Sequence, residues 1–238
     1  MAYDHKICER AAFFVNEAYK ISSDPDGRPH TTSEYYQLTG LFAQPRGWFA
    51  HKELYCWAVG DRITGKIYLV FPGTRTFNDW LSNFKFKQIQ DPDKLMDGVE
   101  SGAANIYLQM LKPIRQLVAI YRDHLVITGH SLGAQLATLA CWDNRVDCGY
   151  LFASPRVGSI AWAEKFDAKF HDVYRILNTE DLVPTMPLPA ATGVLLRAFS
   201  KLTFQHIGKP YCFTKNTGDI INNHHMETYI AGLKGEHL

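Results

Sequence analysis

The feature that most constrains the fold of this chain is the pentapeptide G-H-S-L-G at residues 129–133. An apolar, β-rich run at residues 125–128 precedes it, and the helix-forming run A-Q-L-A-T-L-A-C-W follows it. Small residues two positions before and two positions after a serine allow the chain to turn sharply from a strand into a helix, which exposes the serine hydroxyl. The motif therefore predicts a strand–turn–helix unit with Ser131 as a nucleophile, rather than a simple glycine turn.

Other patterns along the chain predict strands and helices in alternation. Apolar residues at helical spacing, from Ile7 to Ala18, predict an opening amphipathic helix, and a second helix is expected at residues 102–121. Short apolar runs predict strands, the first two forming a hairpin, at residues 54–59, 67–71, 125–128, 150–153 and 173–177. Strands that alternate with helices after an opening hairpin indicate a mostly parallel sheet with helices on both faces.

The length and composition indicate one compact domain, residues 1–238. Hydrophobic residues make up 46% of the chain and charged residues 21%, which is typical of a soluble globular protein. The formal net charge is +1 and there is no run of Lys or Arg. A nucleic acid is therefore not an expected partner.

The start of the chain and its cysteines favour the cytoplasm. The first ten residues carry charged side chains where a secretory signal needs an apolar region, and no stretch reaches the ~20 apolar residues of an integral membrane segment. The five cysteines are dispersed and form no C-x-x-C pair, so we expect free thiols and no metal site. A secreted protein from which a leader has been removed is the alternative.

A serine hydroxyl is a weak nucleophile, so it needs a histidine base and a carboxylate that orients the histidine. In folds built on such a turn, the acid follows the serine along the chain and the histidine follows the acid. The strand V-Y-R-I-L is followed by N-T-E-D-L-V-P, which supplies Glu180 and Asp181 just beyond a strand end. We predict Asp181 as the acid and interpret Glu180 as a solvated loop charge.

The base is expected in the C-terminal run N-N-H-H-M-E-T-Y, where asparagines suited to starting a helix precede two adjacent histidines. The chemistry alone does not decide between His224 and His225. His206 lies in the strand-like run T-F-Q-H-I-G, and we interpret it as a core or edge histidine.

These motifs resemble those of the class 3 (fungal-type) lipases from F-P-G-T-R-T at residue 71 to H-H-M-E-T-Y at residue 224. Besides the serine turn, F-A-S-P-R-V-G-S from residue 152 is similar to the family's F-G-x-P-R-V-G, and N-T-E-D-L-V-P to its N-x-x-D-x-V-P loop. The resemblance implies an α/β-hydrolase fold with a mostly parallel central sheet flanked by helices on both faces. The family's H-x-M/L-x-x-Y pattern favours His224 as the base. In other members of the family the histidine lies one residue closer to the tyrosine, which corresponds to His225 here.

The resemblance also implies the remaining parts of the site. The oxyanion hole would be formed by Thr74, after the strand-end glycine, and by the backbone N–H of Leu132. The aromatic stretch F-N-D-W-L-S-N-F resembles the family's lid, in which Phe77 and Trp80 either cover the site or pack against it. His130 is a further candidate for contact with a lid or the substrate.

Two variable regions bear on the choice of substrate. Residues 187–204 include an amphipathic run that we predict to wall an acyl pocket through Leu188, Val194 and Leu195, the alternative being that they complete the core. Where the family often has V-H-x-G-F, this chain has V-E-S-G-A from Val99, which loses a histidine and an aromatic residue.

The expected function is a serine carboxylic-ester hydrolase, a triacylglycerol lipase or esterase that forms an acyl-enzyme on Ser131. A phospholipase A1 or an aromatic-acid esterase on the same machinery is the alternative. A noncatalytic lipid-binding protein of the same fold is more remote. No cofactor or metal is expected, and the expected partner is an ester or lipid substrate, with transient contact with a lipid interface.

Overall fold

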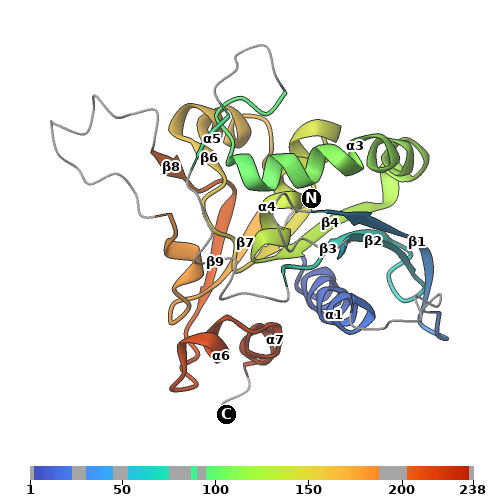
Figure 1. Ribbon diagram of the computed structural model, residues 1–238. Coiled ribbons are helices and arrows are strands. Elements are labelled where there is room, and N and C mark those ends of the chain that lie inside the picture. The colour runs from blue at the N-terminus through green and yellow to red at the C-terminus, as the bar shows by residue number, and fades with distance from the viewer. Residues whose placement is uncertain are drawn as a thin grey trace, which may run out of the picture.

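The computed structural model describes residues 3–22, 31–44, 53–74, 87–89, 95–187 and 203–235. At its centre lies a seven-stranded sheet of order β1-β2-β3-β4-β5-β7-β9 (Figure 1). Its strands are β1 Tyr35–Ala43, β2 Glu53–Asp61, β3 Ile67–Phe71, β4 Leu125–His130, β5 Gly149–Phe152, β7 Val173–Asn178 and β9 Lys209–Phe213. A small second sheet pairs β6 (Gly158–Ser159) with β8 (Phe204–Gln205).

In the central sheet, β2 pairs antiparallel with both β1 and β3, and every pairing from β3 to β9 is parallel. Phe71 at the end of β3 is in register with Gly129 near the end of β4. The carboxyl ends of the parallel strands therefore meet at one edge of the sheet, which is where parallel sheets present their binding sites. The expected mostly parallel sheet is confirmed.

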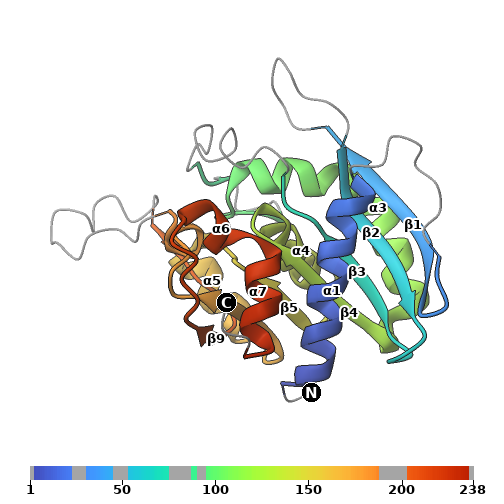
Figure 2. The ribbon, with the colours of Figure 1, turned by 90° about the horizontal axis from the view of Figure 1, so that it is seen from below.

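Helices cover both faces of the sheet. On one face, α1 (His5–Ser22) and α7 (Met226–Leu233) lie side by side, as Figure 2 shows. The other face carries α3 (Ser101–Tyr121), α4 (Leu132–Asn144) and α5 (Ile160–Asp167) (Figure 1). The short elements are α6 (Ile220–His224) and the 3₁₀ turns η1 (Arg122–His124) and η2 (Val183–Thr185).

The alternation of side chains along β3 explains the two layers of core. Leu69 and Phe71 belong to the core beneath α3 and α4, whereas Tyr68 and Val70 belong to the core beneath α1 and α7. Successive side chains of a strand point to opposite faces, so a strand buried on both sides is apolar throughout. The run I-Y-L-V-F, buried at every position, meets that requirement.

The expected strands and helices are confirmed where the structure describes them, and the helix predicted at residues 102–121 is α3. Strands β1 and β9 were not expected. Pro210 lies within β9, and a proline argues against a strand except at the edge of a sheet, which is the position of β9. Among the described helices, none is long and apolar enough to cross a membrane. That residues 1–238 form one domain stays a prediction.

Candidate active site

Ser131 lies at the sharp turn between β4 and α4, as the pentapeptide predicts. Its backbone has φ 57° and ψ −126°, a conformation that residues with a side chain rarely adopt. The residue is 3% exposed, and its Oγ has no hydrogen-bond partner among the described residues. The hydroxyl is thus held at a strained turn with its hydrogen-bonding capacity unused by the described protein groups.

The two glycines of the pentapeptide are needed because the turn packs tightly. A Cβ on Gly133 would lie 1.9 Å from the carbonyl oxygen of Phe71 at the end of β3. A Cβ on Gly129 would lie 2.3 Å from the carbonyl oxygen of Gly133. Glycine at both positions allows α4 to start directly against the end of β3, and this contact fixes where Ser131 lies.

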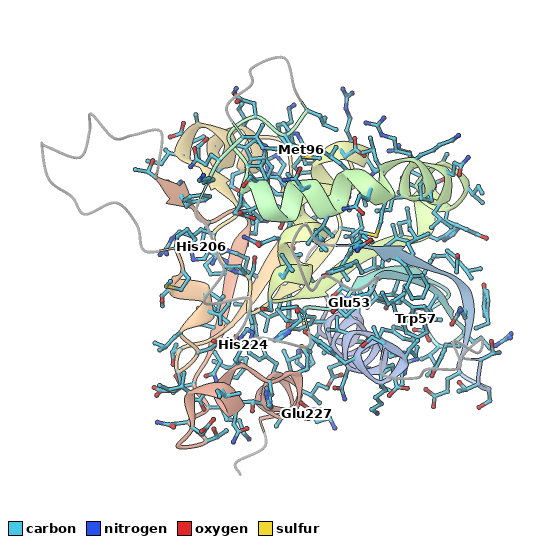
Figure 3. All side chains as sticks on the ribbon, in the orientation of Figure 1. Glu53, Trp57, Met96, His206, His224 and Glu227 are labelled. Carbon is cyan, nitrogen blue, oxygen red and sulfur yellow. The ribbon has the colours of Figure 1, made fainter. Side chains whose placement is uncertain are left out.

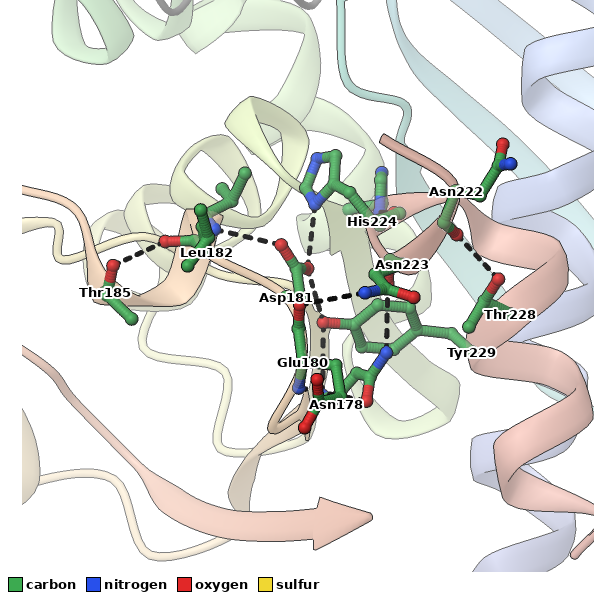
Figure 4. Close-up of polar contacts among 12 residues, drawn as sticks. Asn178, Glu180, Asp181, Leu182, Thr185, Asn222, Asn223, His224, Thr228 and Tyr229 are labelled. Atoms are coloured by element: carbon green, nitrogen blue, oxygen red, sulfur yellow. Dashed lines mark hydrogen bonds and ion pairs between the residues drawn. The ribbon is translucent and has the colours of Figure 1, made fainter. Parts of the chain in front are cut away.

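Asp181 and His224 are hydrogen-bonded to each other (Figure 4). Asp181 lies in the loop after β7 and His224 at the end of α6, and His224 Nδ1 lies 2.8 Å from Asp181 Oδ2. Both side chains are buried. Tyr229 Oη–H donates to the same Oδ2 at 2.7 Å, and the backbone N–H of Val183 donates to Oδ1 at 2.9 Å. The carboxylate is therefore held in one orientation, facing the imidazole.

Tyr229 is a supporting residue whose role the sequence motif did not reveal. Burial, together with the nearby Asp181 carboxylate, raises the pKa of Tyr229, so its hydroxyl keeps the proton that it donates. The Tyr229 hydroxyl also accepts the backbone N–H of Asn178 at 3.2 Å, at the end of β7. One phenol thereby links α7, β7 and the acid-bearing loop.

The candidates for the acid and the base have different surroundings in the structure. His225 is exposed and directly precedes α7 as its N-cap, whereas the neighbouring His224 is buried against Asp181. Glu180 accepts a hydrogen bond from the side chain of Asn216 at an exposed position. His206 lies just after β8, apart from the contacts between Asp181 and His224, and both histidines are labelled in Figure 3. Of the candidates Glu180, Asp181, His206, His224 and His225, only Asp181 and His224 are hydrogen-bonded to each other.

His130 connects the serine turn to the segment that carries His224. Its Nε2 lies 2.8 Å from the carbonyl oxygen of His224, and the two ring centroids are 4.6 Å apart. Because His130 directly precedes Ser131, the structure brings the serine turn and His224 together. His130 is 3% exposed and its other ring nitrogen, Nδ1, lies 2.7 Å from Tyr19 Oη, while its expected contact with a lid or substrate stays a prediction.

The residues expected to form the oxyanion hole, Thr74 and Leu132, lie near Ser131 at the edge of the sheet where the parallel strands end. Thr74 is half-buried and follows Gly73, where an added Cβ would come 3.1 Å from Ser131 Cβ. Leu132 is buried in the first turn of α4, where backbone N–H groups have no partner within the helix. The end of β3 and the start of α4 thus flank Ser131 from two sides.

Some expected residues fall outside the part of the chain that the structure describes. They are the lid candidates Phe77 and Trp80 and the acyl-wall candidates Leu188, Val194 and Leu195. The run V-E-S-G-A, which departs from the family's V-H-x-G-F, lies within the part of the chain that the structure describes. There Glu100 caps helix α3 by accepting hydrogen bonds from the backbone N–H groups of Gly102 and Ala103. That glutamate therefore has a structural role in place of the family's histidine.

A strained, buried serine beside a histidine that is oriented by a carboxylate is the arrangement that activates a hydroxyl for attack on a carbonyl carbon. A histidine held through Nδ1 by a carboxylate presents Nε2 as the proton acceptor. Backbone N–H groups at a helix start, next to the serine, are suited to stabilising negative charge on oxygen. The arrangement can therefore support acyl transfer through a covalent intermediate.

Comparison with known proteins gives matches to lipases and phospholipases. A chloroplastic/mitochondrial phospholipase A1 of Oryza sativa subsp. indica is 28% identical over 208 residues, covering 71% of this chain and 48% of the relative. A secreted mono- and diacylglycerol lipase A of Penicillium cyclopium is 32% identical over 140 residues, covering 54% of this chain and 45% of the relative. The chain thus spans about half the length of these curated relatives.

Fold and family agree with these matches. The Rhizomucor miehei lipase in its propeptide complex has a TM-score of 0.69 to this structure at 18% identity, covering 98% of this chain and 80% of that one. This likeness confirms the expected α/β-hydrolase fold. A model of the family described as "Lipase (class 3)" matches residues 68–191, just over half of the 238 residues. The chain therefore belongs to the class 3 lipase family.

Proposed function

We propose that this protein is a serine carboxylic-ester hydrolase that acts on acylglycerols. Ser131 is the nucleophile, His224 the general base and Asp181 the acid that orients the base. The observation that carries the proposal is the 2.8 Å contact between His224 Nδ1 and Asp181 Oδ2, beside a serine with φ 57° at a strand-to-helix turn. A buried histidine–carboxylate pair next to a strained serine is the arrangement that activates a serine hydroxyl for nucleophilic attack.

In the proposed reaction, Ser131 Oγ attacks the ester carbonyl carbon while its proton passes to His224 Nε2. The negative charge that forms on the carbonyl oxygen is stabilised by the backbone N–H groups of Thr74 and Leu132. The C–O bond to the alcohol then breaks, and the alcohol leaves with the proton from His224. A water molecule, deprotonated by the same histidine, attacks the acyl-enzyme and releases the carboxylic acid and Ser131.

A phospholipase A1 is the second candidate. It is favoured by the names of several relatives, among them the phospholipase A1 of Oryza sativa, whereas the Penicillium cyclopium relative is named a mono- and diacylglycerol lipase. Both activities cleave a carboxylic ester of glycerol by the same acyl-enzyme steps. The two candidates differ only in the head group that the site accepts.

We also propose that the protein contacts a lipid interface transiently. Leu182 directly follows the proposed acid and is 54% exposed. Ile220 and Ile221, in the short helix that ends at the proposed base, are 60% and 42% exposed. Exposed apolar side chains beside a site suit contact with a water-insoluble substrate. The activity on an emulsion, compared with that on the same ester in solution, tests this contact.

The compartment is proposed to be reducing, as in the cytoplasm. All five cysteines are free thiols, and three of them, Cys8, Cys56 and Cys141, are buried. Proteins that work in oxidising compartments are more often cross-linked by disulfides. Cell fractionation followed by immunodetection tests the proposal, and recovery of the protein from the medium would contradict it.

Hydrolysis of p-nitrophenyl esters, emulsified triacylglycerol, diacylglycerol and phosphatidylcholine by the purified protein tests the function. We expect Ser131→Ala to lower kcat by on the order of 10⁶, because removal of one member of such a set disables the others. The adjacent histidines are a matched pair. We expect His224→Ala to abolish turnover and the exposed His225→Ala to retain it.

A fluorophosphonate probe gives an independent readout, because it labels only an activated serine. We expect labelling of the wild type and none of Ser131→Ala. An unlabelled wild type without esterase activity would favour the noncatalytic lipid-binding alternative. If phosphatidylcholine is cleaved and acylglycerols are not, the second candidate replaces the first.

A further inference from the structure

Tyr19 brings the first helix of the protein into the proposed active site. It lies in the last turn of α1, and its hydroxyl is 2.8 Å from the backbone nitrogen of Gly73 and 2.7 Å from His130 Nδ1. Gly73 directly precedes the proposed oxyanion residue Thr74, and His130 directly precedes Ser131. One phenol oxygen therefore contacts the neighbours of two proposed catalytic residues.

The hydrogen bonds around Tyr19 and His130 have a single consistent direction. The Gly73 N–H donates to Tyr19 Oη, so the phenol proton is available to donate to His130 Nδ1. The other ring nitrogen, Nε2, must then carry the imidazole proton and donate it to the carbonyl oxygen of His224. If the imidazole proton were on Nδ1 instead, Nε2 would have no proton to donate. Two hydrogen-bond acceptors, Nε2 and the carbonyl oxygen of His224, would then face each other.

The protonation states of both groups are compatible with this direction. Burial lowers the pKa of His130, and the neighbouring His224 lowers it further, so the ring is neutral. Burial raises the pKa of Tyr19, so its hydroxyl keeps its proton. The three bonds form a relay that runs from Gly73 through Tyr19 and His130 to the His224 carbonyl.

The relay also explains why residue 73 is glycine. A Cβ at that position would lie 2.4 Å from Tyr19 Oη and 2.9 Å from the carbonyl oxygen of His130. Any side chain would push the phenol away from the end of β3 and from the serine turn. Glycine at position 73 thus lets the end of β3 lie close to the serine turn, which places Thr74 near Ser131, and it also leaves room for the Tyr19 hydroxyl.

We propose that Tyr19 and His130 are positioning residues that fix the three catalytic segments relative to one another: the oxyanion end of β3, the Ser131 turn and the His224 segment. This inference rests on the proposed function, since positioning is defined by the reaction it supports. Neither residue exchanges a proton with the substrate. They act instead by fixing the distances and angles between the catalytic groups that exchange protons with the substrate. A misplacement of such a group by about 1 Å can lower the rate by about 10²-fold.

Tyr19→Phe tests the relay with the smallest change, because it removes only the hydroxyl. We expect kcat per titrated active site to fall about 10- to 100-fold while KM changes less than about threefold, since a residue that positions catalytic groups alters the rate more than the binding of substrate. The matched control is Tyr150→Phe, which removes another partly buried hydroxyl, bonded to the Asp4 backbone. We expect its kcat to equal that of the wild type. Active-site titration with a fluorophosphonate normalises each rate to folded enzyme.

The histidine tautomer provides a readout that does not depend on activity. In a long-range ¹H–¹⁵N spectrum of the ¹⁵N-histidine-labelled wild type, we expect His130 to be neutral with its proton on Nε2, and His130→Gln identifies its signals. In Tyr19→Phe the Nδ1 partner is lost, so we expect those signals to shift. A His130 protonated on Nδ1 in the wild type would overturn the relay even if Tyr19→Phe did not fold.

The outcomes separate the two proposals. If the wild type has no hydrolase activity and no fluorophosphonate labelling, the proposed function fails while the tautomer still reports on the relay. If the wild type is active, Ser131→Ala is inactive and Tyr19→Phe has the kcat of Tyr150→Phe, only the positioning role fails. A Tyr19→Phe variant that loses kcat together with the expected His130 shift supports both.

Discussion

At the scale of single residues, the surroundings of His206, which lies outside the proposed site, disfavour the charged form of its ring. Its Nδ1 is buried and has no hydrogen-bond partner among the described residues. Burial, followed by the positive charges of Arg175 and Arg156, lowers the pKa of His206 from 6.5 to about 3. The neutral ring is therefore the form that the folded protein accommodates.

This depressed pKa predicts how stability changes with pH. Below pH 6.5 the unfolded chain binds a proton at His206 that the folded protein does not bind, so acid favours the unfolded state. At pH 5 the loss from this one group is up to about 2 kcal/mol relative to pH 7. We expect His206→Gln to remove that part of the pH dependence, measured by urea unfolding at pH 7 and pH 5. An unchanged difference between the two pH values would contradict it.

At the scale of elements, Glu100 sets the start of α3. Its two carboxylate oxygens accept the backbone N–H groups of Gly102 and Ala103 at 2.8 and 2.7 Å. The side chain is buried, and burial raises the pKa of Glu100. A negative charge at a helix N-terminus is favourable, and the first N–H groups of a helix need acceptors from outside it.

Removing this cap is expected to destabilise the protein without altering the proposed chemistry. We expect Glu100→Ala to lower the free energy of unfolding by about 1–3 kcal/mol, because a buried N–H group loses its acceptor. Glu100→Gln retains one acceptor oxygen and is expected to lose less. Thermal unfolding followed by circular dichroism measures both variants. Equal melting temperatures for Glu100→Ala and the wild type would show that the cap contributes nothing.

The predictability of the elements depends on how local their signals are. The turn at Ser131 was predictable because two glycines, an apolar strand and a helix-forming run are adjacent in the sequence. Strand β9 was not, because Pro210 argues against a strand unless the sheet order is known. Predicting the hydrogen bond between Asp181 and His224, the proposed acid and base, required the family pattern to choose between adjacent histidines, since their difference in burial arises only in the fold.

Tyr19 shows why part of the site was not predictable. In the sequence it is one more aromatic residue in an amphipathic helix, and such residues usually pack in a core. Its hydroxyl gains a role only because the last turn of α1 lies against the end of β3 and the Ser131 turn. These contacts join residues that are far apart in the sequence, and no local sequence pattern predicts them.

At the scale of the whole molecule, α1 is anchored to the sheet by an ion pair. The guanidinium of Arg10 donates to both carboxylate oxygens of Asp61, which ends β2, and Asp61 also accepts the hydroxyl of Thr64. The Asp61 side chain is fully buried, whereas Glu34, the second acidic partner of Arg10, has a side chain that is 52% exposed. The two carboxylates therefore offer a matched comparison on one arginine.

We expect Asp61→Ala to lower the free energy of unfolding by about 3 kcal/mol, because it leaves a largely buried guanidinium without its bidentate partner. Glu34→Ala is expected to lower it by less than about 1 kcal/mol, since exposed ion pairs contribute little. Urea unfolding of both variants, with Arg10→Ala to complete a double-mutant cycle, measures the difference. If Asp61→Ala and Glu34→Ala lower the free energy of unfolding equally, burial of the carboxylate does not determine how much each ion pair with Arg10 contributes.

The pairing of α1 with α7 has a consequence for how the protein is made. During translation α1 is synthesised about 200 residues before α7, a delay of roughly 10 to 40 s at 5–20 residues per second. Throughout this interval the side of α1 that packs against α7 lacks its native cover, so apolar side chains that are buried in the finished fold stay exposed. The His224 carbonyl oxygen, which His130 Nε2 contacts, also emerges late, so this contact between the Ser131 turn and the C-terminal part of the fold forms only after most of the sheet has been synthesised.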